Sequence, residues 1–130
     1  VEVDGQGRSM IRPDLMTPVL VNLTANALRA GTGVRVRIHA RPYGTGSRWS
    51  VEDDGPGMPE DLAARIADAC ARGEVVPGTT GIGLGLAVVL ANLRAMGGRI
   101  AVLNRPGAGV SFDIHLPPAS GTALLPAIRR

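Results

Sequence analysis

The feature that most constrains the fold is a glycine-rich segment that leads directly into an apolar helix. Gly81, Gly83 and Gly85 stand at alternate positions, and apolar residues at helical spacing follow as far as Leu93. Glycine lets a backbone approach an anion closely, and the free N–H groups of a helix's first turn point at it. The segment therefore suits phosphate. It suits equally well a turn that only lets a helix pack closely on a sheet, and the pattern alone does not separate the two.

The composition is that of one globular domain with an aliphatic core. Of the 130 residues, 45% are hydrophobic but only 2% are aromatic, so Leu, Val, Ile, Ala and Met must fill the interior. The net charge is +3, and the basic residues are all Arg. They are spread along the chain without a platform of aromatic side chains, which disfavours nucleic-acid binding.

Several features predict a cytoplasmic domain. No apolar run approaches the roughly 18 residues of a membrane span, so we expect no direct membrane contact. The start, Val1 to Asp4, lacks the basic and apolar regions of a secretory leader and resembles a strand cut from a longer protein. The single cysteine, Cys70, excludes an internal disulfide and fits a reducing compartment. We expect it to be a small buried apolar residue on a helix.

The hydrophobic periodicity predicts strands and helices in a mixed order. The first helix begins at Asp14 as N-cap, or at Thr17-Pro18, and ends at Gly31. The polar segment from Arg72 to Thr80 has no clear period, which predicts a mobile loop. The other predicted elements are strands at 1–3, 34–39, 49–51, 100–102 and 110–116, a helix at 59–70, and a helix from the glycine segment to Met96.

Two asparagines on the first helix need an explanation. Asn22 and Asn26 are four residues apart and therefore share one helix face, with Arg29 beside Asn26. Asparagine is a poor helix former, so a pair near the core has a specific purpose. Either both amides are satisfied by neighbouring backbone, or the amide oxygen of Asn26 is a ligand for Mg²⁺, which takes few protein ligands beside water and phosphate oxygens.

A third motif ends the strand that contains Trp49 and Val51. It reads Asp53-Asp54-Gly55-Pro56-Gly57. A carboxylate held at a strand end can accept a hydrogen bond from an exocyclic amine such as that of adenine. The alternative is a tight turn closed by an Asp side chain.

Together the three motifs resemble the ATP-binding fold of the GHKL superfamily, which includes gyrase B, heat-shock chaperone ATPases, MutL-type proteins and sensor histidine kinases. Their order and spacing are most similar to the catalytic domain of sensor histidine kinases, over roughly 1–118. Neither a Walker P-loop nor a G-x-G-x-x-G fingerprint is present. The matching segments are 22–27 (N box), 51–58 (first glycine box), 81–89 (second glycine box), and 97–100 with 107–117 (closing hairpin).

The resemblance implies a Bergerat-type α/β two-layer sandwich, with a mixed, mostly antiparallel sheet and three helices on one face. The expected domain is 1–118, followed by a flexible tail at 119–130. Asp53 would bind the adenine amine, Asn26 would ligate Mg²⁺, and the segment 72–80 would be the ATP lid. The full expected set is Asp53, Gly55, Gly57, Thr80, Gly81, Gly83, Leu84, Gly85 and Asn26 for ATP and Mg²⁺, with Asn22 and Arg29 as catalytic residues at the phosphates.

The implied activity is transfer of the ATP γ-phosphate to a histidine on a separate dimerisation domain of the same protein, and from there to a response regulator. Gyrase-like relatives have a general-base Glu where this chain has Asn22, and an amide cannot take up a proton at pH 7. We expect His39 and His115 to face outward on strands and not to be acceptors, and we expect the isolated domain to be monomeric.

Some positions depart from the family pattern. Arg29 stands where Lys is usual, Val110 where Thr is frequent, and the phenylalanine-bearing box before a short lid is missing. The missing phenylalanine box and Val110 motivate one alternative, a degenerate docking module without catalysis. Two alternatives with the same fold but other chemistry are an anti-sigma-type serine kinase and a GHKL ATPase.

Overall fold

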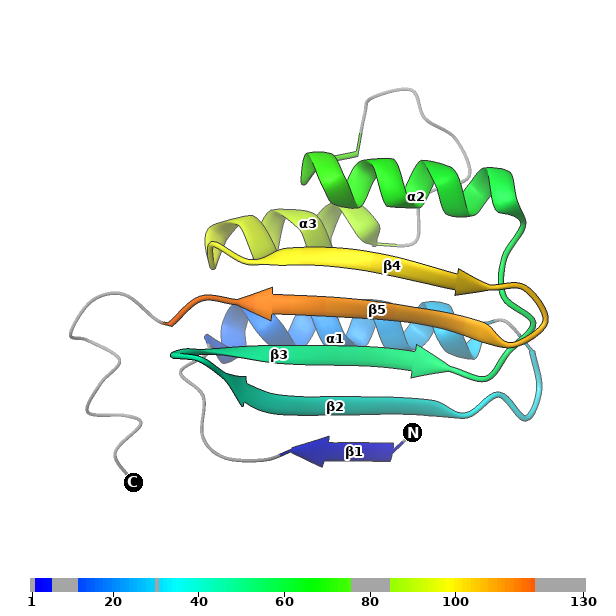
Figure 1. Cartoon of the computed structure of the whole chain (residues 1–130), viewed down its shortest axis with the longest axis horizontal. Coiled ribbons are helices and arrows are strands. Elements are labelled where there is room, and N and C mark those ends of the chain that lie inside the picture. Colours follow the sequence, from blue (N-terminus) through cyan, green and yellow to red (C-terminus); the bar gives the residue numbers. More distant parts are fainter. Residues whose placement is uncertain (1, 6–11, 30, 76–84, 119–130) are drawn as a thin grey trace.

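A mixed five-stranded sheet forms one layer of the molecule (Figure 1). The computed structural model describes residues 2–5, 12–29, 31–75 and 85–118. The strand order is β1-β2-β3-β5-β4; β1 pairs parallel with β2, and the other pairs are antiparallel. The strands are β1 (Glu2–Gly5), β2 (Val36–Tyr43), β3 (Gly46–Asp53), β4 (Arg99–Arg105) and β5 (Gly109–Leu116).

Three helices form the second layer and cover one face of this sheet. In Figure 1, α1 lies behind β3 and β5, while α2 and α3 lie toward the β4 edge. The helices α1 (Pro13–Leu28) and α3 (Leu86–Ala95) pack against each other, and α2 (Glu60–Arg72) packs against β4. The predicted two-layer α/β architecture is confirmed. Within the described residues, no helix combines the length and the apolar character needed to cross a membrane.

The core is aliphatic, as the composition predicts. Alternate residues of the strands and one stripe of each helix are buried, which is the pattern of a sheet covered on one side. The buried apolar side chains are Met16, Val19, Leu23, Ala27, Val36, Ile38, Val51, Ile66, Ala69, Cys70, Leu86, Val89, Leu90, Leu93, Ile100, Val110, Phe112, Ile114 and Leu116.

The opposite face of the sheet is polar, and none of the helices that the structure describes covers it. Arg41, Arg48, His115 and Arg99 stand in register across four strands, and the Arg48 guanidinium lies 5.0 Å from the ring centroid of Tyr43. His39 lies on this same face, 3.6 Å from the carboxylate of Glu52. Both histidines therefore lie on the uncovered face, as predicted.

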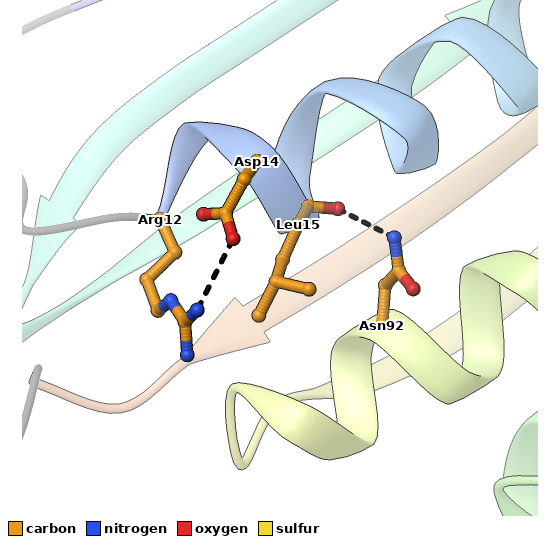
Figure 2. Close-up of polar contacts among 4 residues, drawn as sticks. All are labelled: Arg12, Asp14, Leu15 and Asn92. Atoms are coloured by element: carbon orange, nitrogen blue, oxygen red, sulfur yellow. Dashed lines mark hydrogen bonds and ion pairs between the residues drawn. The ribbon is translucent and has the colours of Figure 1, made fainter.

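The start of α1 differs from the prediction. Arg12 is the N-cap and Pro13 is the first helical residue, so Asp14 lies inside the first turn and is not the cap. Its carboxylate accepts a hydrogen bond from Arg12 at 3.1 Å (Figure 2). Pro suits this first position because its missing N–H would have no partner there. Pro18 is inside the helix; the N–H it lacks would have met the carbonyl of Asp14, which lies in the exposed first turn.

Three other predicted boundaries shift. The strand expected at 34–39 runs from Val36 to Tyr43, which leaves only Gly44 and Thr45 in the hairpin turn. Arg72 is the last residue of α2, where it donates to Asp68 at 2.8 Å, so the predicted loop begins after it. Gly73, with φ 77°, ends that helix in the left-handed conformation. Residues 76–80, and the predicted tail at 119–130, lie outside the described residues.

Cys70 is a free, buried thiol on α2, as predicted, and its burial raises its pKa from 9.0 to about 11. The thiolate, not the thiol, is the reactive species, so at pH 8 the folded protein should be alkylated about a hundredfold more slowly than an exposed cysteine. Mass spectrometry after timed iodoacetamide treatment measures this rate. Ala71→Cys in a Cys70→Ala background moves the thiol to the exposed neighbouring position as a control. Equal rates at the two positions would contradict the burial.

Candidate ATP-binding site

Two of the three sequence motifs meet where α1 crosses the start of α3. Asn22 donates from Nδ2 to the carbonyl oxygen of Pro18 at 2.7 Å, one turn earlier in its own helix. Its Oδ1 lies against Gly85, the N-cap of α3, so closely that a Cβ on Gly85 would collide with it. Gly85 also has φ 81°, a conformation that other residues adopt only with strain. Glycine is therefore required at this position on two independent grounds.

Asn26 and Arg29 lie at the C-terminal end of α1. An N–H of the Arg29 guanidinium donates to Oδ1 of Asn26 at 3.0 Å. The side chain of Arg29 is exposed and that of Asn26 is half-buried. The predicted proximity of these two residues is confirmed. The contact also means that the oxygen expected to hold a metal ion already accepts a hydrogen bond from a cation.

Asp53 is the last residue of β3, and its carboxylate is anchored on one side. Oδ1 accepts backbone N–H groups from Gly55 at 2.9 Å and from Val110 at 3.3 Å. Within the described part of the chain, no group bonds to Oδ2. The carboxylate is half-exposed, so one oxygen is fixed to the backbone and the other is available to a ligand. The Asp53 side chain closes an Asx-type turn to Gly55 with Oδ1 and leaves Oδ2 available for an amine. The two interpretations of this motif are therefore compatible.

The neighbouring Asp54 has a different arrangement. Its Oδ1 accepts the backbone N–H of Arg35 at 2.7 Å, and its own N–H donates to the carbonyl of Arg35 at 3.2 Å. Asp54 therefore closes the start of β2 onto the end of β3. It is an internal comparison for Asp53, because the two carboxylates are adjacent but have different partners.

The loop after β3 is held against the turn between β4 and β5. Gly107 donates its N–H to the carbonyl of Pro56 at 2.7 Å. Gly57, with φ 79°, lies so close to the backbone of Arg105 that an added Cβ would come within 2.8 Å of its carbonyl oxygen. Asn104 bonds to both backbone groups of Met58. Gly55 is buried and Gly57 half-buried in this arrangement.

Asn104 was not identified from the sequence, although a signal was present. It follows the inward-facing Ile100 and Val102 at the strand period of two, and this alternation indicates a polar side chain that points toward the helices. Asn92 was also missed: its Nδ2 donates to the carbonyl of Leu15 at 2.9 Å and links α3 to α1 (Figure 2).

The fit of Mg²⁺ depends on a single protein oxygen. Among the described residues, no group of three or more His, Cys, Asp or Glu side chains is arranged to hold a metal ion. The oxygen of Asn26 is a hard donor of the kind that Mg²⁺ accepts, and Mg²⁺ commonly completes its shell with water and phosphate oxygens. The residues present thus fit a phosphate-bound Mg²⁺ but not a site made by protein alone. Thr80, Gly81, Gly83 and Leu84 lie outside the described residues.

A family model described as "Histidine kinase-, DNA gyrase B-, and HSP90-like ATPase" matches residues 11–120. The chain belongs to this family. Sensor protein KdpD of Escherichia coli (strain K12) is 32% identical over 145 residues, covering 95% of this chain and 16% of KdpD. Sensor histidine kinase AruS of Pseudomonas aeruginosa is 41% identical over 118 residues, covering 83% of this chain and 12% of AruS. The chain therefore spans less than a fifth of each of these curated relatives.

Solved structures give the same family at the level of the fold. The nucleotide-free catalytic domain of histidine kinase ThkA superposes with a TM-score of 0.69 at 28% identity, covering 88% of this chain and 75% of that domain. Full-length ShkA in complex with AMPPNP gives a TM-score of 0.65 at 31% identity, covering 94% of this chain and 26% of ShkA. This member of the family is an ATP-binding domain of the histidine-kinase type.

The contact between Asn22 and Gly85 generates a stability prediction. Gly85→Ala should destabilise the domain by more than the roughly 1–2 kcal/mol of a left-handed residue, because the new Cβ also collides with Asn22. Gly33→Ala is the matched control, since Gly33 has φ 80° and nothing within 4 Å of an added Cβ. Urea unfolding followed by circular dichroism measures both.

Asn22→Ala in the Gly85→Ala background removes the colliding amide. We expect it to reduce the excess destabilisation of Gly85→Ala over Gly33→Ala. Equal losses in the two glycine variants, with no effect of the second substitution, would show that α1 and α3 are not in contact at this point.

Proposed function

We propose that this chain is the catalytic domain of a sensor histidine kinase. It transfers the γ-phosphate of ATP to a histidine on a separate dimerisation domain of the same protein, from which a response regulator receives it. The observation that carries the proposal is the carboxylate of Asp53, with Oδ1 anchored by two backbone N–H groups and Oδ2 left for a ligand. A one-sided anchor of this kind orients a charged acceptor without occupying it.

Asp53 provides the base end of the site. The free carboxylate oxygen accepts a hydrogen bond from the exocyclic amine of adenine, and guanine, which carries a carbonyl oxygen at that position, is disfavoured. Gly57 lets the backbone pass close to Arg105 in the β4–β5 hairpin. On the strength of the family motif, Gly55 and Gly57 leave room beside the base. Full-length ShkA, to which this chain is similar at 31% identity, was solved in complex with AMPPNP, which supports a nucleotide as the ligand.

Asn22, Asn26 and Arg29 provide the phosphate end. They lie along α1, and Asn22 touches Gly85 at the start of α3. The family motif assigns the remaining phosphate contacts to the backbone of the glycine segment, with Thr80, Gly81, Gly83 and Leu84. Arg29 moves from Asn26 to the phosphates and neutralises their charge, which frees the oxygen of Asn26 for Mg²⁺. When bound, Mg²⁺ neutralises charge on the transferring phosphoryl group.

The site favours transfer over hydrolysis. A general base for water would have to stand at Asn22, and a neutral amide cannot take up a proton. Asn22 is also held by the carbonyl of Pro18. The nucleophile must then come from another domain, because His115 lies on the uncovered face of the sheet beside the ring of Tyr43, and His39 lies on that face beside Glu52. We further propose that the domain, 1–118, is cytoplasmic, makes no direct membrane contact and is monomeric when isolated.

The role of Asp53 predicts a selective loss of nucleotide affinity. Asp53→Asn keeps a carbonyl oxygen for the two backbone N–H groups. In place of Oδ2 it presents an uncharged NH₂ group, which is a donor and cannot accept a hydrogen bond from the adenine amine. Calorimetric titration should show ATP binding weakened roughly tenfold to a hundredfold. Asp54→Asn is the matched control, because Asp54 bonds to Arg35 and has no proposed ligand. A protein that binds no ATP at high concentration would overturn the proposal in favour of the docking-module hypothesis.

The role of Asn26 predicts a loss of metal dependence. In the intact domain, adding Mg²⁺ should tighten ATP binding. In Asn26→Ala the metal-free affinity should change little, while the gain from Mg²⁺ should largely disappear because the single protein ligand is lost. Titrations of ATP with and without Mg²⁺ measure this difference. An undiminished Mg²⁺ effect in Asn26→Ala would remove Asn26 from the metal site.

A further inference from the structure

One carboxamide fastens the loop after β3 to the end of β4. Oδ1 of Asn104 accepts the backbone N–H of Met58 at 2.9 Å, and Nδ2 of Asn104 donates to the carbonyl oxygen of Met58 at 2.9 Å. The two residues are 46 positions apart in the sequence. A single side chain thus satisfies both backbone groups of a half-buried residue, in the way that a neighbouring strand would.

The two hydrogen bonds between Asn104 and Met58, which we call the clamp, lie at the far end of the segment that begins with Asp53. At the near end, Asp53 is fixed to Gly55 and Val110. Between the two ends the chain contains Gly55 and Gly57, which restrict the backbone least of all residues. Without a tether at Met58, this glycine-containing segment has many conformations available, and ordering it upon ligand binding costs free energy.

The clamp acts together with the backbone of the β4–β5 turn. The N–H of Gly107 donates a hydrogen bond to the carbonyl of Pro56 at 2.7 Å, and Gly57 lies close to the carbonyl of Arg105. In the described part of the chain, Asn104 supplies two of the three hydrogen bonds that join residues 56–58 to this hairpin. The loop that borders the proposed adenine position is therefore preformed mainly by a residue of a different strand.

We propose that Asn104 is a positioning residue for base recognition. Acting through Met58, it holds the segment from Gly55 to Met58 in the conformation that receives adenine, and so contributes to the preference for adenine over guanine. This inference rests on the proposed function, because it presupposes that Asp53 binds the base. It assigns Asn104 no contact with the phosphates, which the proposed function places at α1 and α3.

The chain contains a matched comparison for this residue. Asn92 is also a half-buried asparagine whose side chain bonds across two elements, with Nδ2 donating to the carbonyl of Leu15 at 2.9 Å (Figure 2). It links α3 to the first turn of α1, away from the loop after β3. A general effect of removing a half-buried asparagine should appear in both residues, whereas an effect on base recognition should appear only at Asn104.

The experiment is a calorimetric comparison of wild type, Asn104→Ala, Asn104→Asp and Asn92→Ala, titrated with ATP, GTP and inorganic tripolyphosphate in the presence of Mg²⁺. We expect Asn104→Ala to weaken ATP binding roughly tenfold, to leave tripolyphosphate binding unchanged and to lower the preference for ATP over GTP. Asn92→Ala should keep the wild-type preference. Asn104→Asp retains an acceptor for the Met58 N–H but loses the donor, so we expect it to behave like Asn104→Ala.

Hydrogen exchange at the amide of Met58 provides an independent readout of the clamp. Exchange should accelerate in Asn104→Ala and stay closer to wild type in Asn104→Asp, which keeps the bond to that N–H. If Asn104→Ala does not fold, the preference for ATP over GTP in Asn104→Asp decides the question alone.

The outcomes separate the two proposals. A wild-type protein that binds no ATP overturns the proposed function and this inference with it. A wild-type protein that binds ATP, together with Asn104 variants that retain the full preference for ATP over GTP, overturns this inference and leaves the proposed function standing. A loss of preference in Asn92→Ala equal to that in Asn104→Ala also overturns it, because the effect would then be general.

Discussion

The structure depends on the way in which the end of the central strand β3 is fixed. Gly109 approaches the carbonyl of Asp53 so closely that no side chain fits at that position, and its φ of 113° is one that glycine tolerates. The next residue, Val110, donates its N–H to the carboxylate of Asp53. Because Oδ1 of Asp53 bonds to the N–H of Val110 at the start of β5, the orientation of the carboxylate follows from the pairing of β3 with β5. A recognition group placed in this way needs little reorganisation when a ligand arrives.

Polar side chains fix the other elements around this point. The aliphatic core supplies the free energy of burial but is compatible with many small displacements of a helix. Asn92 and Asn104 each bond to a backbone carbonyl of another element, and they link α3 to α1 and the loop after β3 to β4. In the described residues, no buried side-chain nitrogen or oxygen lacks a hydrogen-bond partner. Aliphatic packing thus stabilises the fold, and these two amides fix the positions of the helices and the loop.

The sequence predicted the elements well because their residues repeat at the periods of helix and strand. It predicted the position of Asp53 at a strand end and the contact of Asn26 with Arg29, since both depend on neighbours within a few residues. It placed the start of α1 wrongly. Arg12 is the N-cap but its side chain makes no capping bond, and the helix starts there because Pro13 suits the first helical position. It missed the bonds of Asn104 and Asn92, whose partners lie 46 and 77 positions away. The strand period indicates which way Asn104 faces, but the partners of both residues are consequences of the assembled fold.

Because the described helices cover one side of the sheet, each central strand has a core face and a bare face. Side chains alternate across each strand, so Arg48 and His115 point to the bare face while the adjacent Ser47 and Ile114 are buried. Substitutions of Arg48 or His115 would alter the charge of the bare face, on the side of the sheet away from the helices. These two positions can therefore vary without a direct change in the packing of the helices on the sheet. The fold separates the part of the protein that is free to diverge from the part that is not.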